Sequence, residues 1–329
     1  MSTVKAINLV LPEIEVYVAG CSIDGKLVLN LRNTLVDPLV KVELVGRGFL
    51  RWLEEDNPDL DYYKSTACTN DAVYVFKTKN FHIEGGCLDS GVHIFDFHFN
   101  FPPSIPSTFT SKIGCISYFV QGICCSCQDV LAKEERCLLL QGSTGNHSRY
   151  VEDEAPVVVE ARKDVIYFCC FSYGSVILRI FLEKRIFCPG ETIVFKTDIC
   201  NRTNMYVRKV CFAVLCIVLY SGFSSRGELR SLETQSEVTR LELQTNTAPF
   251  GTMRVTSSLV LPKPMPVTST LKQNKIMAFK YELVGTSDLS CATSTIIARA
   301  PIIIAATLDH FSGEKNTVPL HENKGVIIK

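Results

Sequence analysis

The sequence predicts an all-β protein made of two tandem, immunoglobulin-like β-sandwich domains. Three observations support this prediction: apolar and polar residues alternate with period two, no long helical pattern is sustained, and the chain contains an internal duplication. Its 329 residues are enough for two domains of ordinary size. Many short strands without alternating helices are typical of β-sandwiches.

The strongest alternation lies in His93–Phe101, where from Phe95 on phenylalanine occupies every second position and polar residues stand between. This pattern predicts a strand with one buried face and one solvated face. The other strand-like runs, in chain order, are Lys26–Leu31, Val40–Leu44, Val73–Lys77, Ile116–Gln121, Cys137–Gln141, Val176–Leu182, Thr192–Ile199, Val210–Tyr220, Ser257–Leu261, Ala278–Val284 and Ile302–Ile304. By contrast, the charged run Arg226–Leu243 predicts a short helix or a charged loop.

The internal duplication relates the two halves of the chain. Phe101-Pro-Pro-Ser-Ile-Pro106 recurs as Leu261-Pro-Lys-Pro-Met-Pro266, and an aromatic strand follows each copy. Gly25 and Gly190 each open a strand early in their half, so we pair them as equivalent positions. The repeat predicts an N-terminal domain over residues 1–142, a linker over 143–156, a C-terminal domain over 157–307 and a short tail over 308–329.

Composition excludes several classes of function. Basic and acidic residues are equal in number, 34 each, so no overall charge favours nucleic acid, and we expect no nucleic-acid partner. The apolar run at the start of the chain is too short for a signal-peptide core, and Val210–Tyr220 is too short to cross a bilayer. The fifteen cysteines are odd in number, and many lie in apolar runs, which indicates reduced thiols in a cytoplasmic protein.

No catalytic motif appears, so we predict a protein that is not an enzyme and needs no cofactor. Asp96 and His98 share a strand face and could act as base and orienter, but no nucleophile accompanies them, so we favour an ordinary solvated sheet face. Cys124, Cys125 and Cys127, near Cys115 and Cys137, contain one Cys-x-x-Cys spacing. These cysteines could form a zinc site or be buried thiols on neighbouring strands. We favour buried thiols and predict no metal. For Cys169-Cys170 two interpretations stay open: a site of reversible acylation, or two thiols in the sandwich core.

Several motifs together resemble the arrestin-domain-containing, or alpha-arrestin, family. In the first half these are Gly91-Val-His-Ile-Phe-Asp-Phe-His-Phe-Asn-Phe-Pro102, Ile105-Pro-Ser-Thr-Phe109 and Gly114-Cys-Ile-Ser-Tyr118. In the second half they are Cys169-Cys170, Gly174-Ser-Val176, Phe187-Cys-Pro-Gly-Glu191, Asn201-Arg-Thr203 and Ala300-Pro-Ile-Ile-Ile304. The resemblance implies two arrestin-like sandwiches and a cytosolic adaptor that binds the tails or loops of membrane proteins and couples them to intracellular transport and sorting.

Family members of this kind often recruit WW-domain ubiquitin ligases through Pro-Pro-x-Tyr motifs. Here the Pro-Pro pair Pro102-Pro103 is followed by serine and isoleucine. Trafficking or ubiquitin machinery therefore stays open as a partner, but not through that motif. We expect a cytoplasmic protein, with peripheral association at the plasma membrane or endosomes left open. The alternative function is a static assembly scaffold at a membrane that moves no cargo.

Two stretches are candidate binding sites. The first is a predicted loop that holds five acids and the chain's one tryptophan, a residue common at interaction hot spots; we predict partner binding by Arg51, Trp52, Glu54, Glu55, Asp56, Asp59 and Asp61. The alternative is a solvated charge run with Trp52 in the core. The second is a basic stretch where an anionic lipid head group or a phosphorylated tail would contact Arg179, Lys184 and Arg185, against a plain solvated face.

Overall fold

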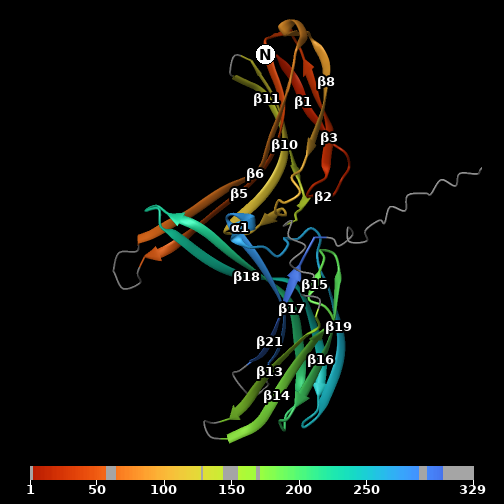
Figure 1. Cartoon of the computed structure of the whole chain (residues 1–329), viewed down its shortest axis with the longest axis vertical. Helices are drawn as coiled ribbons and strands as arrows, with labels where there is room; N and C mark the ends of the chain where they lie inside the picture. Colours follow the sequence, from red (N-terminus) through yellow and green to blue (C-terminus); the bar gives the residue numbers. More distant parts are fainter. Residues whose placement is uncertain are drawn as a thin grey trace, which may run out of the picture.

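The computed structural model describes residues 3–56, 64–126, 129–143, 155–167, 171–288 and 295–306. Within these ranges the regular structure is almost entirely β-strand, with a 3-10 turn η1 (Glu84–Gly86) and a short helix α1 (Leu271–Asn274). The strands form two sandwiches placed end to end, the upper and lower lobes of Figure 1. The predicted all-β fold with tandem sandwiches is confirmed. No helix in the described ranges is long and apolar enough to span a membrane.

In the N-terminal sandwich, a three-stranded sheet with order β1-β3-β8 faces the strands β11-β10-β5-β6. The two layers pack closely, because a Cβ added at Gly122 of β10 would lie 2.3 Å from Leu27 Cδ1 of β3. The bounds are β1 (Val4–Val10), β2 (Tyr17–Val18), β3 (Ser22–Leu31), β4 (Leu35–Val36), β5 (Pro38–Asp56), β6 (Lys64–Phe81), β7 (Cys87–Leu88), β8 (Gly91–Asn100), β9 (Phe109–Thr110), β10 (Gly114–Ser126), β11 (Asp129–Leu138) and β12 (Leu140–Gln141).

In the C-terminal sandwich, a four-stranded sheet with order β13-β14-β16-β19 faces β17, β18, β20, β21 and β15. Edge-to-face contact between Phe195 of β16 and Phe212 of β17, with ring centroids 4.8 Å apart, joins the layers. The bounds are β13 (Val157–Tyr167), β14 (Phe171–Leu182), β15 (Ile186–Phe187), β16 (Thr192–Asn201), β17 (Val207–Ser224), β18 (Leu229–Thr247), β19 (Thr252–Val260), β20 (Met277–Asp288) and β21 (Thr295–Ile304). The exact domain limits derived from the repeat stay predictions.

The alternation in β8 has the predicted consequence. Phe97 and Phe99 are buried, and Phe101, just after the strand, is buried too, while Asp96 and His98 are exposed. The apolar run Val210–Tyr220 lies inside β17, as predicted. Burying one face of each strand supplies the apolar surface that holds the two sheets together.

The prediction for Arg226–Leu243 was wrong, because most of this run belongs to the 19-residue strand β18. The strand pairs with β17 along nearly its whole length. Its register shifts between Val214 and Leu215 of β17, so Val238 is an extra residue in β18. Such a bulge moves the core-facing positions from even to odd residue numbers, which hides the period-two pattern from sequence inspection.

The internal duplication has a structural counterpart. The hydroxyl of Tyr118 donates a hydrogen bond to the Pro106 carbonyl, and that of Tyr281 donates to the Pro266 carbonyl, both at 2.7 Å. The glycine pairing was wrong, however. Gly20, not Gly25, matches Gly190: both have a φ of 86°, and each donates its N–H to the carbonyl of a proline, Pro102 or Pro262. Gly25 instead lies within β3, where an added Cβ would meet the Phe97 ring at 2.5 Å.

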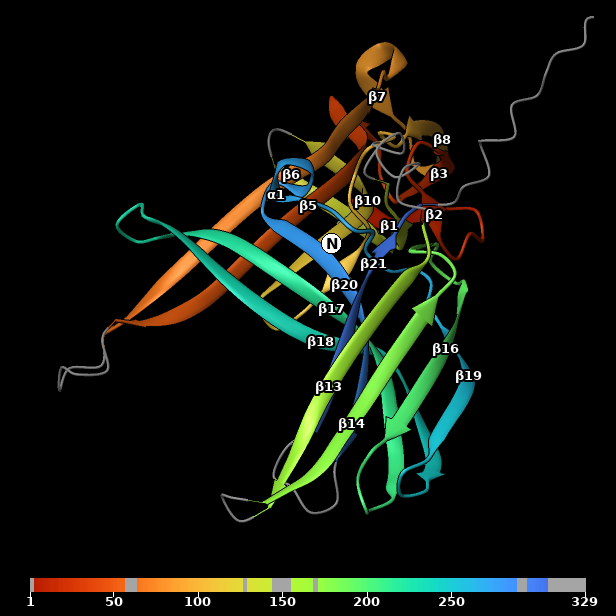
Figure 2. The same cartoon turned by 60° about the horizontal axis from the view of Figure 1, so that its bottom comes forward.

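The two sandwiches are joined through β6 and β17. Thr69 pairs with Phe223 and Cys68 with Ser224, so the two domains share one ten-stranded sheet. The hairpins β5–β6 and β17–β18 project together to the same side of the molecule in both views (Figures 1 and 2). Asn70 strengthens the junction by donating its side-chain amide to the Ser221 carbonyl at 2.8 Å.

A buried polar clamp also fixes the domains to each other. The side chain of Gln141 donates to the Met265 carbonyl at 3.0 Å and accepts from the Met265 N–H at 3.1 Å. Ser107 donates to the same carbonyl at 3.1 Å. Both polar side chains are about 95% or more buried, so their partners cannot be replaced easily by water. We therefore expect the clamp to be important for stability.

Replacing Gln141 with Leu should lower the free energy of unfolding by about 2 kcal/mol, because it leaves the buried Met265 N–H without a partner. Denaturant unfolding measures this change. Gln235→Leu is the matched control, since Gln235 is exposed on β18, and it should change stability by less than about 0.5 kcal/mol. Equal losses of unfolding free energy in the two variants would contradict a stabilising role of the clamp.

Candidate interaction surface

One side of the ten-stranded sheet is continuous from the N-terminal to the C-terminal domain. Residues directly opposite each other on neighbouring strands lie on the same side of a sheet. The register places Arg51 opposite Thr69, Thr69 opposite Phe223, and Phe223 opposite Leu229. This row crosses four strands and two domains, so a partner that binds along it would contact both domains at once.

Large apolar side chains are exposed along this row and next to it. Phe49 and Leu53 flank Arg51 on the same face of β5, with exposed fractions of 48% and 63%. Phe223 is 47% exposed and Leu229 is 64% exposed. We call Phe49, Arg51, Leu53, Thr69, Phe223 and Leu229 the junction face. An exposed apolar patch on such projecting elements is typical of an interaction site.

Trp52 lies on the opposite side of the sheet and is buried, with 6% of its surface exposed. Its ring packs against Gly222 of β17, where an added Cβ would lie 2.8 Å from the ring. Glu54 is on the same side as Trp52 and forms an ion pair with Arg230 of β18 at 3.8 Å. In this structure both residues join the two hairpins, and Trp52 is placed in the core as in the alternative interpretation.

The other residues of the predicted acidic loop are placed only in part. Arg51 is exposed on the junction face, where the structure brings it next to apolar residues that sequence reasoning missed. The prediction of a loop was wrong for residues 51–56, which belong to β5. The side chains of Glu55 and Asp56 lie outside the described residues, as do Asp59 and Asp61. Partner binding by this loop therefore stays a prediction.

The predicted basic site is divided among separate contacts. The guanidinium of Arg179 donates to Glu160 across β13 and β14, and these contacts raise the pKa of Arg179. Lys184 forms an ion pair with Glu191 and lies over the Phe187 ring, 5.2 Å from its centroid. Arg185 is half-buried. Arg179 and Lys184 thus already contact carboxylates, and anion binding here stays a prediction.

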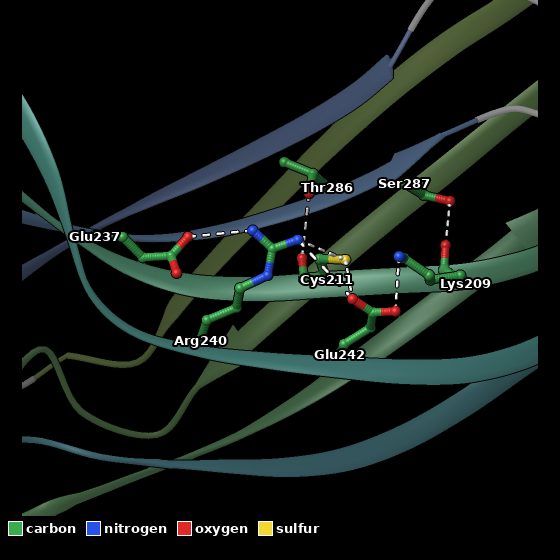
Figure 3. Close-up of polar contacts among 7 residues, drawn as sticks. All are labelled: Lys209, Cys211, Glu237, Arg240, Glu242, Thr286 and Ser287. Atoms are coloured by element: carbon green, nitrogen blue, oxygen red, sulfur yellow. Dashed lines mark hydrogen bonds and ion pairs between the residues drawn. The ribbon is translucent and has the colours of Figure 1, made fainter.

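A polar network lies farther along β17, on the same side of the sheet as the junction face (Figure 3). Lys209 contacts Glu242 at 2.7 Å, which lowers the pKa of Glu242 and raises that of Lys209. Arg240 contacts Glu237 at 3.3 Å and donates to the Cys211 sulfur at 3.6 Å. These charges compensate one another, and the network ties β18 to β17.

The remaining candidates are structural or lie outside the described residues. Asp96 and His98 do not pair with each other, in agreement with the favoured interpretation of a solvated sheet face: His98 contacts Asp24 at 2.7 Å, and Asp96 pairs with Lys26 at 3.4 Å. Burial raises the pKa of the Cys124 thiol to about 11, as for a thiol placed in the core. The described ranges hold no cluster of three or more His, Cys, Asp or Glu side chains suited to a metal. Cys127, Cys169 and Cys170 lie outside those ranges.

A substitution pair on β5 tests the two sides of the sheet. Trp52→Ala should lower the free energy of unfolding by about 3 kcal/mol, because it opens a cavity against Gly222. Leu53→Ala, one residue along and exposed, should change it by less than about 0.5 kcal/mol. Thermal and denaturant unfolding measure both. A small loss in Trp52→Ala would show that the indole is not part of the junction between the hairpins.

Comparison with known proteins gives two matching family models. The model "Arrestin (or S-antigen), N-terminal domain" matches residues 10–143, and the model "Arrestin (or S-antigen), C-terminal domain" matches residues 172–307. Arrestin domain-containing protein 5 from Bos taurus is 45% identical over 307 residues, covering 93% of this chain and 92% of the relative.

The relative of the same name from Homo sapiens is also 45% identical, over 93% of this chain and 89% of its own length. Arrestin domain-containing protein 17 from Caenorhabditis elegans is 25% identical over 202 residues, which cover 58% of this chain and 46% of that protein. Together with the tandem sandwiches, these matches confirm the predicted resemblance, and the chain belongs to the arrestin-domain-containing family.

Proposed function

We propose that this protein is a non-catalytic cytosolic adaptor that binds tails or loops of membrane proteins and couples them to intracellular transport and sorting. The observation that carries the proposal is the junction face, which exposes apolar side chains across both domains. Membership of the arrestin-domain-containing family supports an adaptor role in general. Recruitment of trafficking or ubiquitin machinery would proceed without a Pro-Pro-x-Tyr motif.

An exposed strand edge provides a second element of recognition. In the described part of the chain, β18 pairs only with β17, so its other edge offers backbone N–H and C=O groups. An extended cargo segment would add to this edge as a further strand, and its side chains would reach the junction face at Leu229. Backbone pairing would supply affinity and the apolar contacts would supply selectivity.

Proximity labelling in expressing cells tests the adaptor function. The junction-face variant carries Leu53→Asp and Phe223→Asp, both at exposed positions. The matched control carries Val92→Asp and Ile94→Asp, which are 59% and 58% exposed on β8 in the other N-terminal sheet. We expect the unmodified chain and the control to label integral membrane proteins together with coat or ubiquitin machinery, and the junction-face variant to lose both.

Two results would contradict this proposal. If the junction-face variant labelled the same membrane proteins as the control, the junction face would not be the recognition surface. If all three forms labelled one constant set of structural proteins without transport factors, the static scaffold at a membrane would be the better description. Localisation of the chain at the plasma membrane or endosomes is read from the same experiment.

A further inference from the structure

A separate depression lies on the outer face of the four-stranded sheet of the C-terminal domain, the sheet formed by β13, β14, β16 and β19 in Figure 2. Its volume is about 370 Å³, enough for one or two amino-acid side chains. The side chains around it include Val158, Phe181, Lys196 and Arg254, with Glu183 at its rim. It lies on other strands than the junction face and was not predicted from the sequence.

Arg254 is held with one edge of its guanidinium group occupied. Its Nε and Nη2 atoms donate to the two carboxylate oxygens of Asp198, at 2.6 and 2.7 Å. Asp198 has a side chain only 11% exposed, whereas that of Arg254 is 70% exposed. This side-on pairing leaves the Nη1 N–H groups free to donate to an oxyanion of a ligand. Because Asp198 already fixes the orientation of the guanidinium group, the ligand would bind a pre-oriented donor pair.

The register of the sheet keeps Asp198 paired with Arg254. Glu160, Arg179, Asp198 and Arg254 stand directly opposite one another on four successive strands, with alternating charge. Arg179 donates its hydrogen bond to Glu160 on the far side of this row. The hydrogen bonds from Arg254 hold the pKa of Asp198 below its usual value, so the carboxylate stays ionised at neutral pH.

Lys196 supplies a second cation next to Arg254. It contacts Glu183 at 3.1 Å, but both side chains are exposed, by 53% and 84%. Exposed pairs of this kind contribute little and exchange readily with other partners. An incoming oxyanion could therefore displace Glu183 from Lys196 while Asp198 continues to orient Arg254.

The apolar part of the depression lies beside these cations. Val158 of β13 stands opposite Phe181 of β14, and Phe181 stands opposite Lys196 of β16. Val158 is 60% exposed, and Phe181 is half-buried. A ligand that fills the depression would thus carry an oxyanion for the two cations and a large apolar group. The apolar group would lie one or two strand spacings from Lys196, over Phe181 or Val158.

We propose that this depression binds an acidic peptide segment of a partner protein, with a carboxylate on Arg254 and Lys196 and a neighbouring large apolar side chain on Val158 and Phe181. A membrane surface fits less well, because lipid-binding surfaces usually carry four to eight clustered cations. Here Glu160, Glu183 and Asp198 offset the nearby basic residues. The adaptor function would give the site its purpose, but binding by the purified chain can be measured independently of cargo transport.

Selection of random peptides displayed on phage against the purified full chain tests the proposal. We expect enriched peptides to contain Asp or Glu next to a large apolar residue. The tightest peptide, labelled with fluorescein, is then titrated by fluorescence anisotropy against three variants: Lys196→Glu, Val158→Asp and Arg254→Lys. The first two positions are exposed and should leave the fold intact, and lysine at 254 keeps a cation beside Asp198.

Each variant should weaken binding by about tenfold or more. The matched control is Arg162→Glu, because Arg162 is exposed on the same outer face, pairs with Asp164 and does not line the depression. It should leave the affinity within about twofold. A phosphorylated form of the same peptide is titrated in parallel. If Arg254 binds the oxyanion of the ligand, this form should bind at least as tightly as the unphosphorylated peptide.

Three results would overturn the proposal: no enrichment of acidic peptides, equal binding by Lys196→Glu and the control, or no loss of affinity when the acid of the peptide is replaced by its amide. Co-sedimentation with phosphatidylserine-containing vesicles is measured in parallel. If vesicle binding depended on Lys196 while peptide binding did not, the depression would be a lipid site.

Discussion

The pairing of β6 with β17 is the constraint on which the rest of the structure depends. Two residue pairs, Thr69 with Phe223 and Cys68 with Ser224, join sheets that would otherwise belong to separate domains. Since side chains alternate across a sheet, the same pairing decides which residues are buried and which are exposed. Trp52 falls on the buried side, whereas Arg51 falls on the exposed side with the apolar residues of the hairpins.

Much of the architecture could be predicted from the sequence because local patterns report burial directly. The phenylalanines of β8 and the repeated proline-rich turns with their tyrosines mark a duplicated sandwich. The pattern failed at β18, where a bulge at Val238 reverses the phase of the alternation. It also failed for Gly25, because only backbone geometry shows that Gly20 and Gly190 share the same turn.

The candidate sites were harder to predict because they depend on pairing between distant strands. The sequence led us to predict that Arg179 binds an anionic ligand. Its partner in the structure is Glu160, which is 19 residues away and lies across a strand pair. Arg254 and Asp198 are 56 residues apart, and the exposed edge of that arginine is visible only in the fold. The predicted acidic loop overlaps the hairpin β5–β6, but its tryptophan is buried between the domains while the neighbouring Leu53 faces solvent.

Both domains share one continuous sheet, and the proposed recognition surface depends on that continuity. Native-state amide hydrogen exchange, resolved by residue across β6 and β17, tests it most directly. We expect the amides flanking Thr69 and Phe223 to exchange only when the sandwiches themselves unfold, at the rate of the buried strands β10 and β20. Fast exchange at these amides, while both sandwiches remain protected, would show that the domains open independently and that the pairing of β6 with β17 does not hold them together.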